Sequence, residues 1–199
     1  MDRNDIISID RSFAGRWDNR AREQSDLLLG AGLLLPGSLF YLDRTGFGTL
    51  LVLYAETLAL TNGGTLFAKG VSSRYRPYVY SDRAPLEEKL SGDSKRSFFS
   101  SHAANIAAGF FFSAKVYSDY NPGSRITPYI WAAAIGGSLA GSSLRVEAGR
   151  HFPSDVAAGA VWGGIVSYSV LHFHKKNTNI LVMPFSDNRQ TGVLFVKQY

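Results

Sequence analysis

The feature of this sequence that most constrains its fold is the uneven placement of charge. Long apolar stretches alternate with short stretches in which charged residues crowd together. Apart from Glu56, no Asp, Glu, Lys or Arg occurs in five stretches: 27–42, 46–68, 97–114, 126–144 and 156–174. Because a soluble helix normally carries charged residues along one face, these stretches are either buried on every side or covered by lipid.

The length of these stretches favours lipid. A helix of about 19 residues is about 28 Å long, which matches the hydrocarbon core of a bilayer. A chain of 199 residues has too few other elements to bury five such helices completely. We therefore predict an all-α protein, an up-and-down transmembrane bundle of about five long helices over residues 26–176. A soluble bundle is the alternative, because the stretches are short and rich in Gly, Ala and Ser.

Two further segments flank the predicted bundle. Residues 1–25 are rich in charges of both signs and are predicted to form a separate amphipathic N-terminal segment. In the tail, 177–199, two apolar runs enclose a polar turn, a pattern typical of a β-hairpin. Within the bundle, glycines four residues apart at 137 and 141, and at 159 and 163, predict close contact between helix backbones.

The overall charge narrows the class of ligand. The net charge is +5, which is compatible with nucleic acid, an anionic membrane surface or an anionic substrate. The sequence has no long Lys/Arg run and no zinc-finger spacing, so no nucleic-acid partner is expected. It also has no cysteine, which excludes disulfides and thiolate metal sites. The oligomeric state does not follow from the sequence.

The order of the helices predicts where the unusual charges meet. In an up-and-down bundle, the connections around 69–101 and 145–153 lie at the same end. This arrangement gathers eight polar residues: Lys69, Arg76, Ser100, Ser101, His102, Arg145, His151 and Asp155. Three permanent cations repel one another unless they surround an anion, and guanidinium groups suit phosphate. With two histidines beside them, this set fits phosphoryl transfer through a histidine nucleophile.

The spacing of these residues resembles a known family, the type 2 phosphatidic acid phosphatase superfamily. The family pattern is K-x6-R-P, then P-S-G-H, then S-R-x5-H-x3-D. This sequence carries Lys69 and Arg76-Pro77, then Ser100 and His102, then Arg145, His151 and Asp155 at the same spacing. Three positions depart from the pattern: Phe99 replaces its proline, Ser101 its glycine and Leu144 its serine. No departure removes a charged or titrating group.

The resemblance implies a role for each matched residue. Lys69, Arg76 and Arg145 would bind the phosphoryl oxygens together with Ser100 and Ser101. His151 would attack phosphorus and become a phosphohistidine, and Asp155 would accept a hydrogen bond from the other ring nitrogen of His151. His102 would protonate the leaving oxygen and then activate water. No metal and no other cofactor is implied.

The expected function is therefore metal-independent hydrolysis of a lipid phosphate or pyrophosphate, with membrane lipids as surroundings. Resemblance to bacterial members of the family implies the inner membrane, with the site facing the periplasm. Three alternatives share the same pocket. They are a soluble acid phosphatase acting on small organic phosphates, a vanadium-dependent haloperoxidase, and a membrane protein that keeps the pocket without activity.

Overall fold

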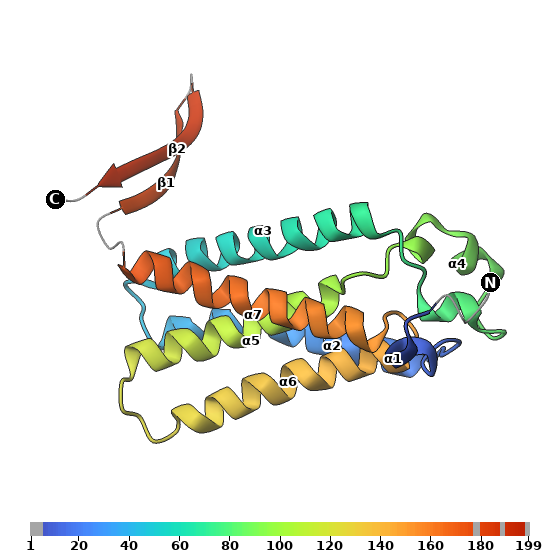
Figure 1. The fold of residues 1–199 in the computed structure, drawn as a ribbon. Coiled ribbons are helices and arrows are strands. Elements are labelled where there is room, and N and C mark those ends of the chain that lie inside the picture. The colour runs from blue at the N-terminus through green and yellow to red at the C-terminus, as the bar shows by residue number, and fades with distance from the viewer. Residues whose placement is uncertain (1–5, 177–179, 188–189, 198–199) are drawn as a thin grey trace.

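The protein is a bundle of long helices with shorter elements at one end (Figure 1). The computed structural model describes residues 6–176, 180–187 and 190–197. The α-helices are α1 (Ser8–Arg11), α2 (Asn19–Leu34), α3 (Phe47–Ser72), α4 (Leu86–Leu90), α5 (Ser101–Tyr120), α6 (Thr127–Glu147) and α7 (Pro153–Lys176). Three 3-10 helices, η2 (Leu35–Tyr41), η3 (Pro77–Tyr80) and η4 (Gly92–Lys95), lie in the connections. Strands β1 (Ile180–Asp187) and β2 (Gln190–Lys197) pair antiparallel, with Ile180 opposite Lys197.

Helix α5 lies at the centre of the bundle and packs against α2, α3, α6 and α7. Its N-terminus is capped by the Ser100 hydroxyl, which accepts a hydrogen bond from the Ala103 amide at 3.3 Å. The buried face of α5 begins with alanines, and Ala103, Ala104, Ala107 and Ala108 have no exposed surface. These small side chains allow the neighbouring helices to approach the α5 backbone closely.

Helices α5 and α7 approach each other closely at a glycine pair that the sequence predicts to serve this purpose. A Cβ atom at Gly163 would collide with the Ala104 carbonyl, and one at Gly159 with the Ser100 carbonyl. The close packing brings the first turn of α7 to the start of α5. There the Ser100 amide donates to the Asp155 carbonyl at 3.0 Å.

The first apolar stretch differs from its expected form. Helix α2 begins at Asn19, within the predicted N-terminal segment, because the Asp18 carboxylate caps it through the Ala21 amide at 3.0 Å. Pro36 has no amide hydrogen to continue an α-helix, and the chain follows the 3-10 helix η2 from Leu35. The stretch that the sequence treats as one segment therefore contains two elements.

The outer surfaces of the long helices are apolar. Within the described part of the chain, two helical segments, Phe47–Tyr80 and Pro153–Lys175, are long and apolar enough to cross a membrane by length and composition. Only 28% and 39% of their most apolar windows are buried, whereas the core helix of a soluble protein is mostly buried. Large side chains on their outer surfaces are well exposed, among them Leu66, Phe67, Val71, Val161 and Phe173.

The helix directions bring the segments that carry the three sequence motifs to one end of the bundle. The end of α3 and the start of α5 lie beside the end of α6 and the start of α7, and α1 and α4 lie at the same end (Figure 1). The connection from α6 to α7 turns at Gly149, which has a φ of 70° that favours glycine. A Cβ atom at Gly149 would also collide with the Arg16 carbonyl, so the N-terminal segment packs directly against this turn.

Candidate active site

His151 lies in this turn with only 1% of its surface exposed. Its Nδ1 atom is 2.8 Å from the carbonyl oxygen of Ser97. A carbonyl only accepts hydrogen bonds, so Nδ1 carries the proton and the lone pair lies on Nε2. The Nε2 atom is 3.5 Å from Nη1 of Arg76. The nitrogen that can attack phosphorus therefore faces a guanidinium group.

The surroundings of His151 keep its imidazole neutral. Burial lowers the pKa of His151 well below its usual 6.5, and the positive charges of Arg76, Arg145 and Lys69 lower the pKa further. All three predicted phosphate-binding cations are thus close enough to act on the ring. A neutral ring at neutral pH is the form required of a nucleophile.

Asp155 contacts His151 less directly than the family resemblance implies. Its Oδ2 atom is 4.0 Å from Nδ1 of His151, because the Ser97 carbonyl already occupies that nitrogen. The same Oδ2 accepts hydrogen bonds from the Ser97 hydroxyl at 2.6 Å and the Phe152 amide at 2.8 Å. Asp155 therefore fixes the position of Ser97, and the backbone of Ser97 orients the imidazole.

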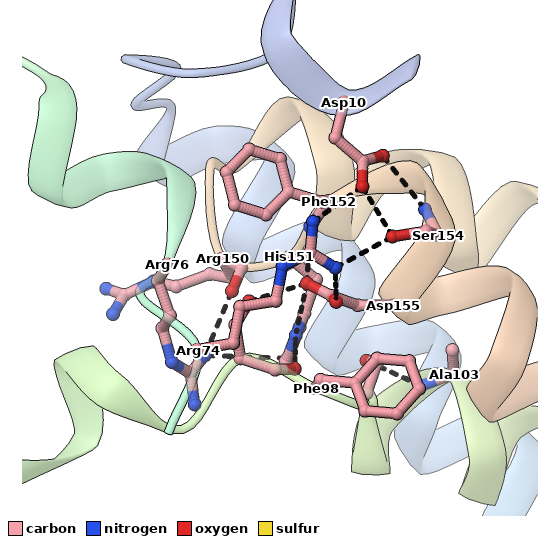
Figure 2. Close-up of polar contacts among 12 residues, drawn as sticks. Asp10, Arg74, Arg76, Phe98, Ala103, Arg150, His151, Phe152, Ser154 and Asp155 are labelled. Carbon is pink, nitrogen blue, oxygen red and sulfur yellow. Dashed lines mark hydrogen bonds and ion pairs between the residues drawn. The ribbon is translucent and has the colours of Figure 1, made fainter. Parts of the chain in front are cut away.

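Arg74 and Asp10 extend this network (Figure 2). Nη1 of Arg74 is 2.5 Å from Oδ1 of Asp155, and Nη2 is 2.6 Å from Oδ2 of Asp10. Asp10 also accepts from the amide and hydroxyl of Ser154, and both carboxylates are fully buried. A single guanidinium group thus compensates two buried carboxylates. The sequence reading missed Arg74, Asp10 and Ser97, although Arg74 stands two residues before a motif arginine.

The two motif arginines are buried, and each is only 5% exposed. Arg76 donates from Nη1 to the Arg150 carbonyl at 3.2 Å and from Nη2 to the Asp93 carboxylate at 2.8 Å. Arg145 donates from Nη1 to the Ser25 hydroxyl at 3.1 Å. Its Nε atom is buried and has no hydrogen-bond partner among the described residues. An unpaired buried N–H is costly, and a phosphoryl oxygen would satisfy it.

The two serines predicted to bind phosphate, Ser100 and Ser101, differ from each other in their surroundings. The Ser101 hydroxyl accepts from Nζ of Lys69 at 2.7 Å and donates to the Thr65 hydroxyl at 3.1 Å, so this serine holds the lysine in place. The Ser100 side chain is buried and caps α5 through the Ala103 amide. In this arrangement Ser100 shapes the start of the helix rather than presenting a free hydroxyl.

His102 occupies the first turn of α5 and contacts a residue that the sequence reading missed. Its Nε2 atom is 3.1 Å from Oδ1 of Asp26, on α2. The same oxygen is 3.3 Å from Nη1 of Arg145. Asp26 therefore joins the predicted acid–base residue to a predicted phosphate-binding residue.

Arg150, next to the candidate nucleophile, connects the site to α4. Its guanidinium forms a two-point contact with the Glu88 carboxylate at 2.6 and 3.2 Å. It also lies 5.0 Å from the ring centres of Trp17 and Tyr78. These contacts fix α4 beside the turn that carries His151. In the described part of the chain, no three His, Cys, Asp or Glu side chains gather so as to hold a metal ion.

The comparisons with known proteins agree with this fold and with the motifs. The family model described as the PAP2 superfamily matches residues 50–179, which include all three motifs. The chain therefore belongs to the PAP2 superfamily. No protein with a curated function matches it in sequence.

Two solved structures share the fold. One is the first transmembrane PAP2 type phosphatidylglycerolphosphate phosphatase from Bacillus subtilis, with a TM-score of 0.56 and 21% identity. The alignment covers 85% of this chain and 84% of that chain. The other is Aquifex aeolicus LpxE, with a TM-score of 0.52, 23% identity, and coverage of 74% of this chain and 83% of that chain.

Proposed function

We propose that this protein is a membrane-embedded phosphatase that hydrolyses a lipid phosphate or pyrophosphate through a phosphohistidine at His151. The observation that carries the proposal is the position of His151. Its imidazole is buried and neutral, its Nδ1–H is held by the Ser97 carbonyl, and its Nε2 faces Arg76. A nucleophile with a fixed lone pair beside permanent cations suits attack on an anionic phosphoryl group.

The proposed reaction has two steps. In the first, the Nε2 lone pair of His151 attacks phosphorus while the bond from phosphorus to the lipid oxygen breaks, and His102 gives a proton to that oxygen. In the second, His102 takes a proton from water, the water oxygen attacks phosphorus, and the bond from phosphorus to Nε2 breaks. Lys69, Arg76 and Arg145 hold the phosphoryl oxygens in both steps. Asp155 lies close enough to stabilise the positive charge on the phosphorylated ring.

A lipid substrate is favoured by the surfaces next to the site. The exposed apolar surfaces of α3 and α7 lead to the end of the bundle that carries His151. A lipid whose tails lie against these helices has its phosphate at the level of the motif residues. The two similar structures are those of a phosphatidylglycerolphosphate phosphatase and of LpxE, which agrees with this choice. We place the site on the periplasmic face of a bacterial inner membrane.

The proposal is tested by phosphate release from a panel of lipid phosphates and pyrophosphates in mixed micelles, with a small aryl phosphate as the soluble reference. We expect hydrolysis of at least one lipid phosphate with a kcat/KM clearly above that of the reference. The same assay on intact and permeabilised spheroplasts, with a short-chain substrate added outside, should give equal rates if the site faces the periplasm. Preference for the aryl phosphate would instead support the acid phosphatase alternative. Peroxide-dependent halide oxidation with added vanadate would support the haloperoxidase.

A further inference from the structure

The two motif arginines, Arg76 and Arg145, are paired with carboxylates that the family pattern does not contain. Nη2 of Arg76 is 2.8 Å from Oδ1 of Asp93, and Nε of the same arginine donates to the Asp93 carbonyl at 3.0 Å. Nη1 of Arg145 is 3.3 Å from Oδ1 of Asp26. That oxygen is also 3.1 Å from Nε2 of His102. Donors needed for a phosphate group are therefore already occupied by carboxylate oxygens.

The two members of each pair differ strongly in exposure. The Arg76 and Arg145 side chains are 6% and 5% exposed, whereas the side chains of Asp93 and Asp26 are 58% and 48% exposed. The carboxylates come from η4 and α2, while the motif cations come from the ends of α3 and α6 and the loop after α3. The arginines are thus held in the protein, and the carboxylates approach them from the solvent side, where they can turn away into water.

We propose that Asp26 and Asp93 are internal counter-ions that occupy the phosphate-binding donors when no substrate is present and that a phosphate group must displace. This inference rests on the function proposed above. The physical reason is the charge of the site, because three clustered cations without an anion repel one another. A carboxylate supplies one negative charge, whereas a phosphate monoester carries nearly two near neutral pH and offers three acceptor oxygens. A monoester therefore displaces the carboxylates more readily than a singly charged diester does.

Arg145 also has a donor that neither carboxylate occupies. Its Nε atom is buried and has no partner among the described residues, so a phosphoryl oxygen that enters the site gains this additional hydrogen bond. Binding of the phosphoryl group displaces Asp26 from Nη1 of Arg145 and from Nε2 of His102. The release of Asp26 frees His102 for proton transfer to the leaving oxygen. After hydrolysis, the return of both carboxylates promotes release of inorganic phosphate.

The test measures binding of inorganic phosphate to the full-length protein in detergent by titration calorimetry, a readout that needs no turnover. The variants are Asp26→Asn and Asp93→Asn, which keep side-chain shape and remove the competing charge. Asp82→Asn is the matched control, because Asp82 is exposed in the same connection as Asp93 and its replacement changes the net charge equally. Thermal unfolding of each variant shows whether it is folded, and Asp26→Ser and Asp93→Ser replace any variant that is not.

We expect each test variant to bind phosphate about three- to fivefold more tightly than the control does, the effect of removing one half-exposed ion pair. Affinities equal to that of Asp82→Asn, or weaker, would overturn the proposal. If Asp26 served only to orient His102, Asp26→Asn would lower kcat and leave the phosphate affinity unchanged, which also contradicts it. Tighter phosphate binding without hydrolysis of any lipid phosphate would support the counter-ions and refute the proposed function. Hydrolysis of a lipid phosphate by the unaltered protein, together with unchanged phosphate binding in the variants, would support the proposed function and refute the counter-ions.

Discussion

Replacement of His151 by alanine is expected to lower turnover of the best lipid phosphate by at least about 10³-fold, the order of loss when a catalytic nucleophile is removed. The reason is that Nε2 of His151 is the only atom to which the proposed mechanism transfers the phosphoryl group. The measurement is steady-state phosphate release, with rapid-quench analysis of labelled substrate for the phosphoenzyme. No phosphoenzyme should form in the variant.

Two further variants make this result specific. His151→Gln keeps most of the side-chain volume and should be equally inactive, which separates loss of the nucleophile from a packing defect. His172→Ala is the matched control, because His172 is exposed on α7 at the opposite end of the bundle and stacks on Tyr168. It should retain activity close to that of the unaltered protein. Turnover of His151→Ala at an unchanged rate would show that the nucleophile is misassigned.

Asp155→Asn is expected to have the second largest effect, a loss of about 10²- to 10⁴-fold in kcat by analogy with the buried aspartate of a serine protease triad. An asparagine can keep the shape of Asp155 but cannot accept hydrogen bonds from Ser97, Phe152 and Arg74 together. The Ser97 backbone that orients His151 therefore loses its support. The phosphorylated imidazole also loses the negative charge 4.0 Å from Nδ1.

The same substitution should also lower the stability of the folded protein, because it removes the buried carboxylate of the ion pair with Arg74. The typical cost is about 3–5 kcal/mol in the free energy of unfolding. The rate is therefore measured well below the melting temperature of the variant, together with the rate of phosphoenzyme formation. Asp119→Asn is the control, since Asp119 pairs with Lys115 and Lys175 at the opposite end and should not affect catalysis. A fully active Asp155→Asn enzyme would remove Asp155 from the mechanism.

Much of the arrangement follows from local patterns in the sequence. The alternation of apolar and charged stretches predicts the long helices, and their order predicts which connections share an end. Lys69, Arg76, Arg145 and His151 act on one another electrostatically in the structure, as this prediction requires. The family spacing indicates what kind of site this is, and that spacing depends on eight sequence positions and not on tertiary contacts.

The partners of these residues do not follow from local patterns. Arg74 and Asp10 are separated by 64 residues, and Arg145 and Asp26 by 119. Asp10 and Asp26 belong to the charge-rich start of the chain, where a charged side chain is by default solvated. Only the packing of α1 against α7, and of α2 against α5 and α6, brings these carboxylates to Arg74 and Arg145. The direct contact between Asp155 and Nδ1 of His151 was implied by the family pattern, which contains no information about the intervening Ser97 carbonyl.

The most direct test of the account is a crystal structure of the protein with orthovanadate, which takes the place of the phosphoryl group. We predict vanadium bonded to Nε2 of His151, with its oxygens in contact with Lys69, Arg76 and Arg145 and with the Asp26 and Asp93 carboxylates turned away. Vanadate bound elsewhere, bonded through Nδ1, or contacting none of the three cations would contradict the account.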